Sequence, residues 1–490
     1  MSKNPKNIII VGGGTSGSVL AARLSADSRF AVILLEMGPD DDTYGPAILE
    51  PERAPDSWLG APNVELTLMA DKQTVIPAVQ GRMMGGTSAV NGMATLRGMP
   101  SDYDSWEAAG LNGWGWKDVS STFIAAERDL DFGSSPIHGS SGPLPVRRWR
   151  REELGHAQRA YYDGMVETGN KPVTDINDPS QLPGIGVFPV TIDENNKRVS
   201  TSLAYLTADV RARNNLTIRT GVEVTKLNIE AGRATGVTLA TGEEIQADEV
   251  VVSAGALWTP NLLMRSGIGP ADHLKDHGIS VHADLPVGET MSDHLGPGIL
   301  YGHEGPRGGT AGPAQVLLFG ASNGVDVDTH TFPIAPMMSD GPTEFVMAIF
   351  LLKSSGLGSV RLGGAQKEAP IVTVPPLPDN ASDCLTHAFK QLAAWEKSSA
   401  AQTLGCAPVD PINFTAASAP ADALERLTVS YGHMTSTCPM GKVLDADCRV
   451  LGIEGLRVAD ASVMPTIPAG NTYLGCVMIA EQIARKMIAA

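Results

Sequence analysis

Three glycines near the N-terminus have the spacing of a phosphate-binding turn. Gly12, Gly14 and Gly17 follow the G-x-G-x-x-G pattern and come directly after the β-branched run at 8–11. In such a turn the first glycine permits a tight bend, the second lets the backbone approach a pyrophosphate, and the third lets a helix pack closely on a strand. The free N–H groups at the start of that helix attract phosphates. These residues therefore predict a dinucleotide-binding site.

The flanking sequence indicates the elements that would hold these glycines in place. Residues 8–11 are typical of a buried parallel strand, residues 18–26 of a helix, and residues 30–36 of the next strand. That strand ends in Glu36, where a carboxylate can accept hydrogen bonds from ribose hydroxyls and would repel a 2′-phosphate. The order of glycines, helix and acidic residue therefore favours FAD or NAD over NADP.

A second glycine-rich stretch, GRMMGGTSAVNGMATLRG, occupies 81–98. By itself it could be purely structural, or it could lie along an extended cofactor. Taken with the first pattern, it resembles the first signature of the glucose–methanol–choline (GMC) oxidoreductase family of FAD enzymes. The positions that match are Gly81, Arg82, Gly85, Gly86, Ser88, Asn91, Arg97 and Gly98, while Met84 replaces the usual leucine.

Other parts of the chain are similar to the same family. The second GMC signature resembles GALWTPNLLMRSGIG at 255–269. Further similar stretches lie at 102–119, 138–146, 200–206, 215–227 and 284–294, the last with one residue missing. The resemblance therefore extends over nearly the whole chain and implies the family's fold and its FAD.

The resemblance also implies a set of cofactor-binding residues. Those in the first part of the chain are Gly12, Gly14, Thr15, Ser16, Gly17, Glu36, Arg82, Gly86, Ser88, Asn91 and Gly92; those further along are Val224, Asp460, Ala461, Asn471 and Thr472. Val224 is expected to contact adenine through its backbone. In some relatives a histidine just before the signature's asparagine is bonded to the flavin, but Val90 stands there in this chain. The resemblance thus implies noncovalent FAD, and no metal-binding residue is expected.

The stretch YGHMTSTCPMG at 431–441 is similar to the family's catalytic segment, in which a histidine faces the flavin. Oxidation of an alcohol removes the hydroxyl proton and passes the carbinol hydride to flavin N5. A histidine, with an ordinary pKa of about 6.5, can accept that proton near neutral pH. The resemblance therefore makes His433 the expected general base, whereas His294 is expected to support structure.

Tyr473 stands at the start of the last predicted helix, within IPAGNTYLGCVMIAEQI at 467–483. Most relatives have a histidine or asparagine there that holds the substrate oxygen, so the resemblance pairs His433 with a phenol. Three interpretations remain open: a polar catalytic partner, an aromatic wall of the pocket, or distal packing. Asn471 would point elsewhere if both residues were helical, and it is expected to belong to the FAD-binding turn.

The resulting hypothesis is an enzyme that oxidises an alcohol (CH–OH) with FAD and is reoxidised by O₂ or another acceptor. The alternative is a non-oxidative GMC relative, such as a hydroxynitrile lyase or a photodecarboxylase. A third possibility is a flavin-binding protein without catalysis. A compact primary or aromatic alcohol is the favoured substrate, with a sugar or glycoside still open.

Charge and composition exclude several other classes. The formal net charge of −17 argues against nucleic-acid binding, which needs clustered cations. The five cysteines, all beyond residue 383, suggest neither a disulfide framework nor a zinc site and favour a reducing compartment. No run is long enough for a membrane span and no signal peptide is evident, so a cytoplasmic location is expected.

The predicted fold is of the α/β class, α+β overall. A Rossmann-like FAD-binding domain is expected from 1–150, 190–295 and 430–490. It would be interleaved with a substrate-binding domain from 151–189 and 296–429, built on an antiparallel sheet. That sheet is expected to include strands at 344–352, 358–364 and 369–374, followed by a helix at 381–398. The segment is short for the family, so trimmed loops over the active site are expected.

Overall fold

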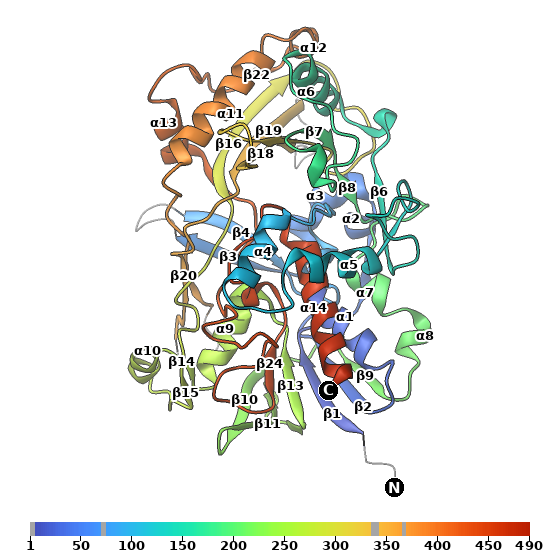
Figure 1. The fold of residues 1–490 in the computed structure, drawn as a ribbon, viewed down its shortest axis with the longest axis vertical. Helices are drawn as coiled ribbons and strands as arrows, with labels where there is room; N and C mark the ends of the chain where they lie inside the picture. The colour runs from blue at the N-terminus through green and yellow to red at the C-terminus, as the bar shows by residue number, and fades with distance from the viewer. Residues whose placement is uncertain (1–4, 70–74, 335–342, 365–368) are drawn as a thin grey trace.

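Two sheets at opposite ends of the long axis dominate the protein (Figure 1). The computed structural model describes residues 5–69, 75–334, 343–364 and 369–490. The sheet built on the first strands of the chain is parallel, and the sheet built on the middle of the chain is antiparallel. This arrangement confirms the predicted fold class. None of the helices within these ranges combines the length and the apolar character needed to cross a membrane.

Five parallel strands form the sheet next to the phosphate-binding turn. In spatial order they are β24 (Leu456–Val458), β13 (Glu249–Val252), β1 (Lys6–Val11), β2 (Phe30–Leu35) and β9 (Leu216–Arg219). Ile8, Ile9 and Ile10 of the central strand are fully buried, as expected for a parallel strand covered on both faces. The predicted strands β1 and β2 are confirmed, and the helix between them, α1 (Thr15–Leu24), begins three residues earlier than the sequence indicates.

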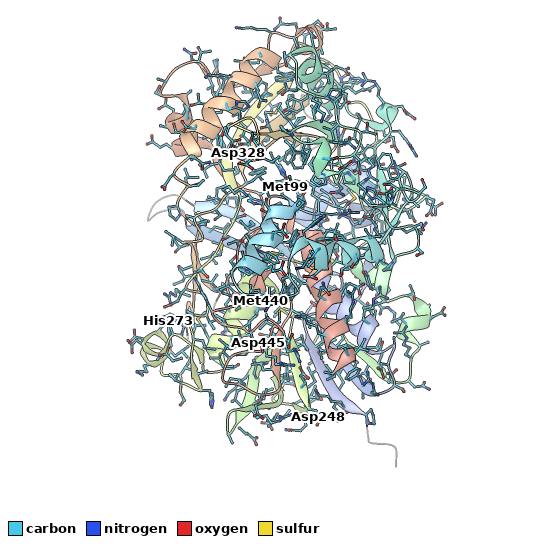
Figure 2. All side chains as sticks on the ribbon, viewed as in Figure 1. Met99, Asp248, His273, Asp328, Met440 and Asp445 are labelled. Atoms are coloured by element: carbon cyan, nitrogen blue, oxygen red, sulfur yellow. The ribbon has the colours of Figure 1, made fainter. Side chains whose placement is uncertain are left out.

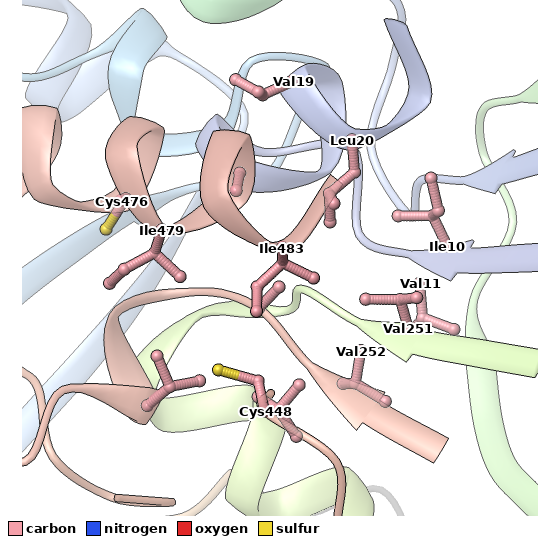
Figure 3. Packing of buried hydrophobic residues seen from close by; sticks show 14 of the residues in the cluster. Ile10, Val11, Val19, Leu20, Val251, Val252, Cys448, Cys476, Ile479 and Ile483 are labelled. Atoms are coloured by element: carbon pink, nitrogen blue, oxygen red, sulfur yellow. The ribbon is translucent and has the colours of Figure 1, made fainter. Parts of the chain in front are cut away.

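The C-terminal helix α14 (Thr472–Ala489) packs beside α1 on this sheet. Leu20 of α1, Ile483 of α14 and Ile10 of β1 belong to one buried cluster (Figure 3). Because these contacts bury almost the whole apolar face of α14, the start of that helix is fixed against the N-terminal glycine turn. The end of the chain therefore contributes to the same site as its beginning.

The second glycine-rich stretch begins where a hairpin ends. β3 (Asn63–Met69) and β4 (Val75–Gly81) pair antiparallel, and the 3₁₀ helix η3 (Gly86–Ala89) follows. β21 (Ile371–Thr373) pairs with β3, and β20 (Ser359–Arg361) pairs with β21. The sequence interpretation that put the runs containing β20 and β21 into the substrate-domain sheet is wrong. A residue pattern predicts a strand but does not specify its partner.

Seven strands form the antiparallel sheet. They are β22 (Ala407–Pro408), β16 (Leu295–His303), β19 (Thr343–Leu351), β18 (Thr329–Ile334), β17 (Val316–Gly320) and β7 (Gly184–Val187), with β23 (Thr428–Ser430) also pairing with β16. The helices that lie with this sheet in Figure 1 are α6 (His156–Glu167), α11 (Ala381–Trp395), α12 (Ser399–Leu404) and α13 (Ala419–Leu427). The predicted strand at 344–352 and the helix at 381–398 are confirmed.

The remaining helices and strands lie around these two sheets and between them (Figure 1). The helices are α2 (Pro46–Leu49), α3 (Ala54–Gly60), α4 (Pro100–Ala108), α5 (Trp116–Ala126), α7 (Thr201–Tyr205), α8 (Ala208–Arg211), α9 (Gly255–Arg265) and α10 (Ala271–Asp276). The strands are β5 (Glu127–Asp129), β6 (Leu144–Arg148), β8 (Pro189–Val190), β10 (Val224–Glu230), β11 (Arg233–Leu239), β12 (Glu244–Gln246), β14 (Ile268–Gly269) and β15 (Ala283–Asp284). Figure 2 shows Asp328 in the half that holds the antiparallel sheet, and Met440 and Asp445 in the half that holds the parallel sheet.

Candidate active site

The turn between β1 and α1 has the features of a phosphate site. Gly14 is the N-cap residue of α1, and no side chain of the described residues caps the first N–H groups of the helix. Gly12 has a φ of +101°, and a Cβ on Gly17 would lie 1.9 Å from the carbonyl oxygen of Gly12. Both positions therefore require glycine, and an anion at the helix start would be stabilised by the helix dipole. Ser16 Oγ donates to the carbonyl oxygen of Cys476 at 3.1 Å, which ties this turn to α14.

Glu36 lies directly after β2, at the edge of the parallel sheet where the turn begins. Its two carboxylate oxygens accept the N–H groups of Gly13 and Gly38, each at 2.8 Å. Burial raises the pKa of Glu36, and these backbone donors oppose that rise. The N–H of Val222 donates to the backbone carbonyl oxygen of Glu36 at 2.9 Å, so the segment leading to Val224 runs beside the backbone of Glu36. The predicted ribose and adenine contacts thus lie in one neighbourhood.

The two glycine-rich stretches touch. Gly86 has a φ of +54°, and a Cβ there would lie 2.8 Å from the Cα of Gly14. The N–H of Gly85 donates to the Gly13 carbonyl oxygen at 2.8 Å. Ser88 Oγ donates to the Gly85 carbonyl oxygen and contacts Thr201 Oγ1. The second stretch is therefore folded against the first, as an extended cofactor would require.

The remaining predicted cofactor residues occupy this region or its borders. Asp460 accepts from the N–H of Gly255 at 2.8 Å and from Thr259 Oγ1 at 2.6 Å, and burial raises its pKa. Ala461 begins the 3₁₀ helix η6 (Ala461–Val463), and its carbonyl oxygen accepts the N–H of Ser436. The other positions are Asn91 and Gly92, which are partly exposed, Arg82, which is exposed, and Thr472, the buried first residue of α14.

His433 is buried and has a neighbour at each ring nitrogen. The amide nitrogen of Asn471 lies 3.1 Å from His433 Nε2, and His294 Nδ1 lies 3.0 Å from His433 Nδ1. The ring of Tyr431 stacks on that of His433 at 4.0 Å between centroids, and Phe350 stacks on the other side of Tyr431 at the same distance. The imidazole is therefore held both in its plane and from its face.

The surroundings keep these imidazoles neutral. Burial lowers the pKa of His433 well below its ordinary value, and the neighbouring His294 and His330 lower it further. Burial lowers the pKa of His294 to about 3. Both ring nitrogens of His330 are buried and have no hydrogen-bond partner in the described part of the chain. His433 is therefore neutral at neutral pH, and one of its ring nitrogens carries a lone pair.

Asp293 fixes the backbone at both histidines. One of its carboxylate oxygens accepts the N–H of His294 at 2.8 Å and the N–H of His433 at 3.0 Å, while the other accepts from Ser430 Oγ. Burial raises the pKa of Asp293 to about 6. Neither Asp293 nor the contact of His294 with His433 was among the expected site residues. The adjacency of the SDH stretch to the catalytic segment becomes visible only after β16 has paired with β23.

Tyr473 does not form a hydrogen bond with His433. Its hydroxyl is buried and has no hydrogen-bond partner among the residues that the structure describes. Burial raises the pKa of Tyr473, and the nearby Thr191 and Arg198 partly oppose that rise. The contact with His433 comes from Asn471, whose Oδ1 is also buried without a partner. Asn471 is the N-cap of α14, with φ −65° and ψ 136°, so the helical angle between the two positions does not apply.

Glu127, Asp129 and His138 form a compact buried cluster with the spacing of a metal site. However, Arg97 pairs with Glu127 at 2.6 Å, and Arg148 pairs with Asp129. Burial opposes protonation of His138, but the surrounding carboxylates raise its pKa to about 10. A protonated imidazole has no free lone pair for a metal, so this cluster is best described as an ion-pair network.

Comparisons with known proteins agree with this geometry. The N-terminal domain of the GMC oxidoreductases matches residues 6–296, and their C-terminal domain matches residues 354–480. The chain belongs to the GMC oxidoreductase family and is an oxidoreductase of that type.

Its relatives include oxidases and dehydrogenases. It is 34% identical to the 5-(hydroxymethyl)furfural oxidase of Methylovorus sp., with 97% of each chain covered. It is 32% identical to the oxygen-dependent choline dehydrogenase of Brucella anthropi, over 97% of this chain and 94% of that one. The crystal structure of pyridoxine 4-oxidase from Mesorbium loti superposes with a TM-score of 0.91 at 29% identity, covering 99% of both chains. The match to the furfural oxidase extends over 530 residues, more than the 490 of this chain, so that relative has segments that are missing here.

Family membership and the fold support FAD as the cofactor. The described residues fit it: a helix start without a side-chain cap, two glycine turns in contact, and a carboxylate at the strand end. These are the parts that a dinucleotide needs.

Proposed function

We propose that this protein oxidises an alcohol with noncovalently bound FAD, and that His433 is the general base. The observation that carries the proposal is the buried, neutral imidazole of His433, held at both ring nitrogens beside the glycine-rich region. When bound, FAD supplies the hydride acceptor N5 and returns the electrons to O₂ or another acceptor. The chain's own side chains would bind the alcohol and accept its hydroxyl proton.

His433 would accept the hydroxyl proton at Nε2. If Asn471 donates an N–H to Nε2, that nitrogen carries the accepting lone pair and no proton. The ring proton is then on Nδ1 and is donated to His294. An arriving alcohol would take the place of the Asn471 amide on Nε2 or share the nitrogen with it. Asn471 Oδ1, which has no partner among the described residues, then remains available to the substrate. Tyr473 stays a candidate for a polar partner or for a wall of the pocket.

Noncovalent binding is supported by Val90. This residue stands where some relatives carry the histidine that bonds to the flavin, and its side chain is apolar and buried. A valine has no nucleophilic atom with which to form that bond. The resident FAD would therefore be released from the unfolded protein.

We propose a compact primary alcohol on an aromatic ring as the substrate. The rings of Phe350, Tyr431 and His433 form one stack, so the surroundings of the base are aromatic. Two similar proteins are named for hydroxymethylfurfural and pyridoxine, which both carry hydroxymethyl groups on aromatic rings. A cytoplasmic location belongs to the same proposal, supported by five free, buried cysteines.

A non-oxidative reaction is the second candidate, because Tyr473 replaces a residue that holds the substrate oxygen in relatives. Anaerobic mixing of the holoenzyme with a panel of alcohols separates the two. Bleaching of the flavin absorbance by an aromatic primary alcohol is the expected result. Absence of bleaching across the panel, together with cyanohydrin cleavage or light-driven release of CO₂, would reject the oxidation.

A further inference from the structure

Arg198 is a buried arginine that holds the second glycine-rich stretch. Only 1% of it is exposed. Its Nε donates to the Ile48 carbonyl oxygen at 2.8 Å, and its terminal nitrogens donate to Asn91 Oδ1 at 2.9 Å and to the Asn91 carbonyl oxygen at 2.7 Å. A longer bond of 3.3 Å reaches the carbonyl oxygen of Ser88. The guanidinium therefore binds four acceptors, and all of them are neutral.

The other buried arginines of the described chain are each paired with a carboxylate. Arg97 pairs with Glu127, Arg147 with Glu153, Arg148 with Asp129 and Asp175, and Arg457 with Glu249. No described carboxylate forms an ion pair with Arg198. The phenols of Tyr44 and Tyr473 lie nearby but are neutral, because burial raises the pKa of each. Burial lowers the pKa of Arg198 to about 10. Burying a charge is costly unless an opposite charge is present.

The position of this cation indicates what its counter-charge is. Arg198 binds the backbone of the segment that contains Ser88 and Asn91, and that segment begins at Gly86, which lies against Gly14 at the start of α1. Gly14 is the N-cap of α1, whose first N–H groups have no side-chain cap. The cation and the helix start, neither of which has a negative partner among the described residues, are thus joined through the contact of the two glycine-rich segments.

We propose that Arg198 supplies the positive charge that balances the anionic part of the bound dinucleotide cofactor. The inference rests on the proposed function in that the cofactor is FAD. That cofactor has two possible anionic parts: the diphosphate, which is always charged, and the flavin ring, which can become anionic on reduction. Arg198 thus links cofactor binding to the fold of residues 86–91, because it donates hydrogen bonds to Ser88 and Asn91 within that segment.

The test measures cofactor binding rather than turnover. The full-length chain is freed of cofactor by dialysis and titrated with FAD, ADP and riboflavin, using ligand fluorescence for the flavins and calorimetry for ADP. Arg198→Gln keeps hydrogen-bonding ability and removes the charge. Its affinity for FAD should fall by about 10- to 100-fold. An equal loss for ADP with no loss for riboflavin assigns the diphosphate, whereas unchanged affinities with a lowered flavin reduction potential assign the reduced ring.

Two further variants keep the test decisive. Arg148→Gln removes a buried guanidinium from the ion-pair network and should leave the affinity for FAD unchanged. Arg198→Lys keeps the charge with fewer donors and should bind FAD more tightly than Arg198→Gln. If Arg198→Gln does not fold and Arg198→Lys does, a loss of FAD affinity of about 100-fold in the lysine variant would overturn the proposal. Unchanged affinity and potential in Arg198→Gln would also overturn it. Failure of the wild-type chain to bind FAD would instead reject the proposed function.

Discussion

His294→Leu is the substitution that most directly tests how the base is held. His294 is completely buried, and its Nδ1 lies 3.0 Å from Nδ1 of His433. Leucine fills a similar volume but cannot accept the ring proton of His433. In that variant the imidazole must either bury an unpaired N–H or move its proton to Nε2, the nitrogen that accepts from the substrate. Both outcomes reduce the fraction of protein with a usable base.

The size of the effect follows from the burial. Leaving a buried donor without an acceptor costs about 1–3 kcal/mol. Since each 1.36 kcal/mol corresponds to about a tenfold change in rate, flavin reduction should slow by about 5- to 150-fold. Substrate binding should change little, because His294 contacts the far nitrogen of His433 and not the one that faces Asn471.

Anaerobic stopped-flow measurement of flavin bleaching, as a function of alcohol concentration, separates the rate of reduction from the dissociation constant of the alcohol. His294→Asn is the matched variant, since its side-chain oxygen can occupy the position of Nδ1 and accept the same proton. It should recover much of the rate lost in His294→Leu. Thermal unfolding of each variant, followed by circular dichroism, reports structural damage independently.

An unchanged reduction rate in folded His294→Leu would refute this reasoning. So would an Asn variant as slow as the Leu variant, because the hydrogen bond would then be irrelevant. A lower melting temperature without a kinetic change would return His294 to the purely structural role expected from the sequence.

Three further predictions concern other residues. His433→Ala should slow flavin reduction by about 10²- to 10⁴-fold in the same assay, and an unchanged rate would reject His433 as the base. Tyr473→Phe removes a buried hydroxyl that has no partner among the described residues, so the free energy of unfolding, measured by denaturant titration, should rise, by up to about 1–3 kcal/mol; a fall would reveal a hydrogen bond of that hydroxyl, and slower flavin reduction would assign the hydroxyl a polar role. The folded-state pKa of His138 is raised to about 10, so its contribution to stability is complete below about pH 6.5 and is lost as the pH rises through 10. The melting temperature of the wild type should therefore fall more steeply over that interval than that of His138→Gln, and equal slopes would contradict the ion-pair network.

Much of the fold could be predicted because its signals are local. The β-branched run of β1, the glycines after it and Glu36 lie within one short segment, and each residue has a role that a turn and a helix start impose on it. The final helix was predictable for the same reason. Pairing between distant strands carries no such signal, which is why β20 and β21 were assigned to the wrong sheet.

The candidate site shows the same division. His433 could be selected from the stretch around it. Its neighbour at Nε2 could not, because the helical angle between Asn471 and Tyr473 applies only if Asn471 is helical. Its extended N-cap conformation reverses the expectation, bringing Asn471 to His433 and leaving the Tyr473 hydroxyl without a partner among the described residues. The catalytic roles of Tyr473 and Asn471 remain predictions.

The sequence by itself therefore determined the family, the phosphate-binding turn and the identity of the expected base, since residue type and short spacing are enough for each. Tertiary structure decided what surrounds them: that His294 and Asp293 hold His433, and that Arg198 is buried without an ion pair to any described carboxylate. Those properties depend on which side chains from distant segments share a desolvated space. Charge and hydrogen-bond balance exist only within that space, so they could not be read along the chain.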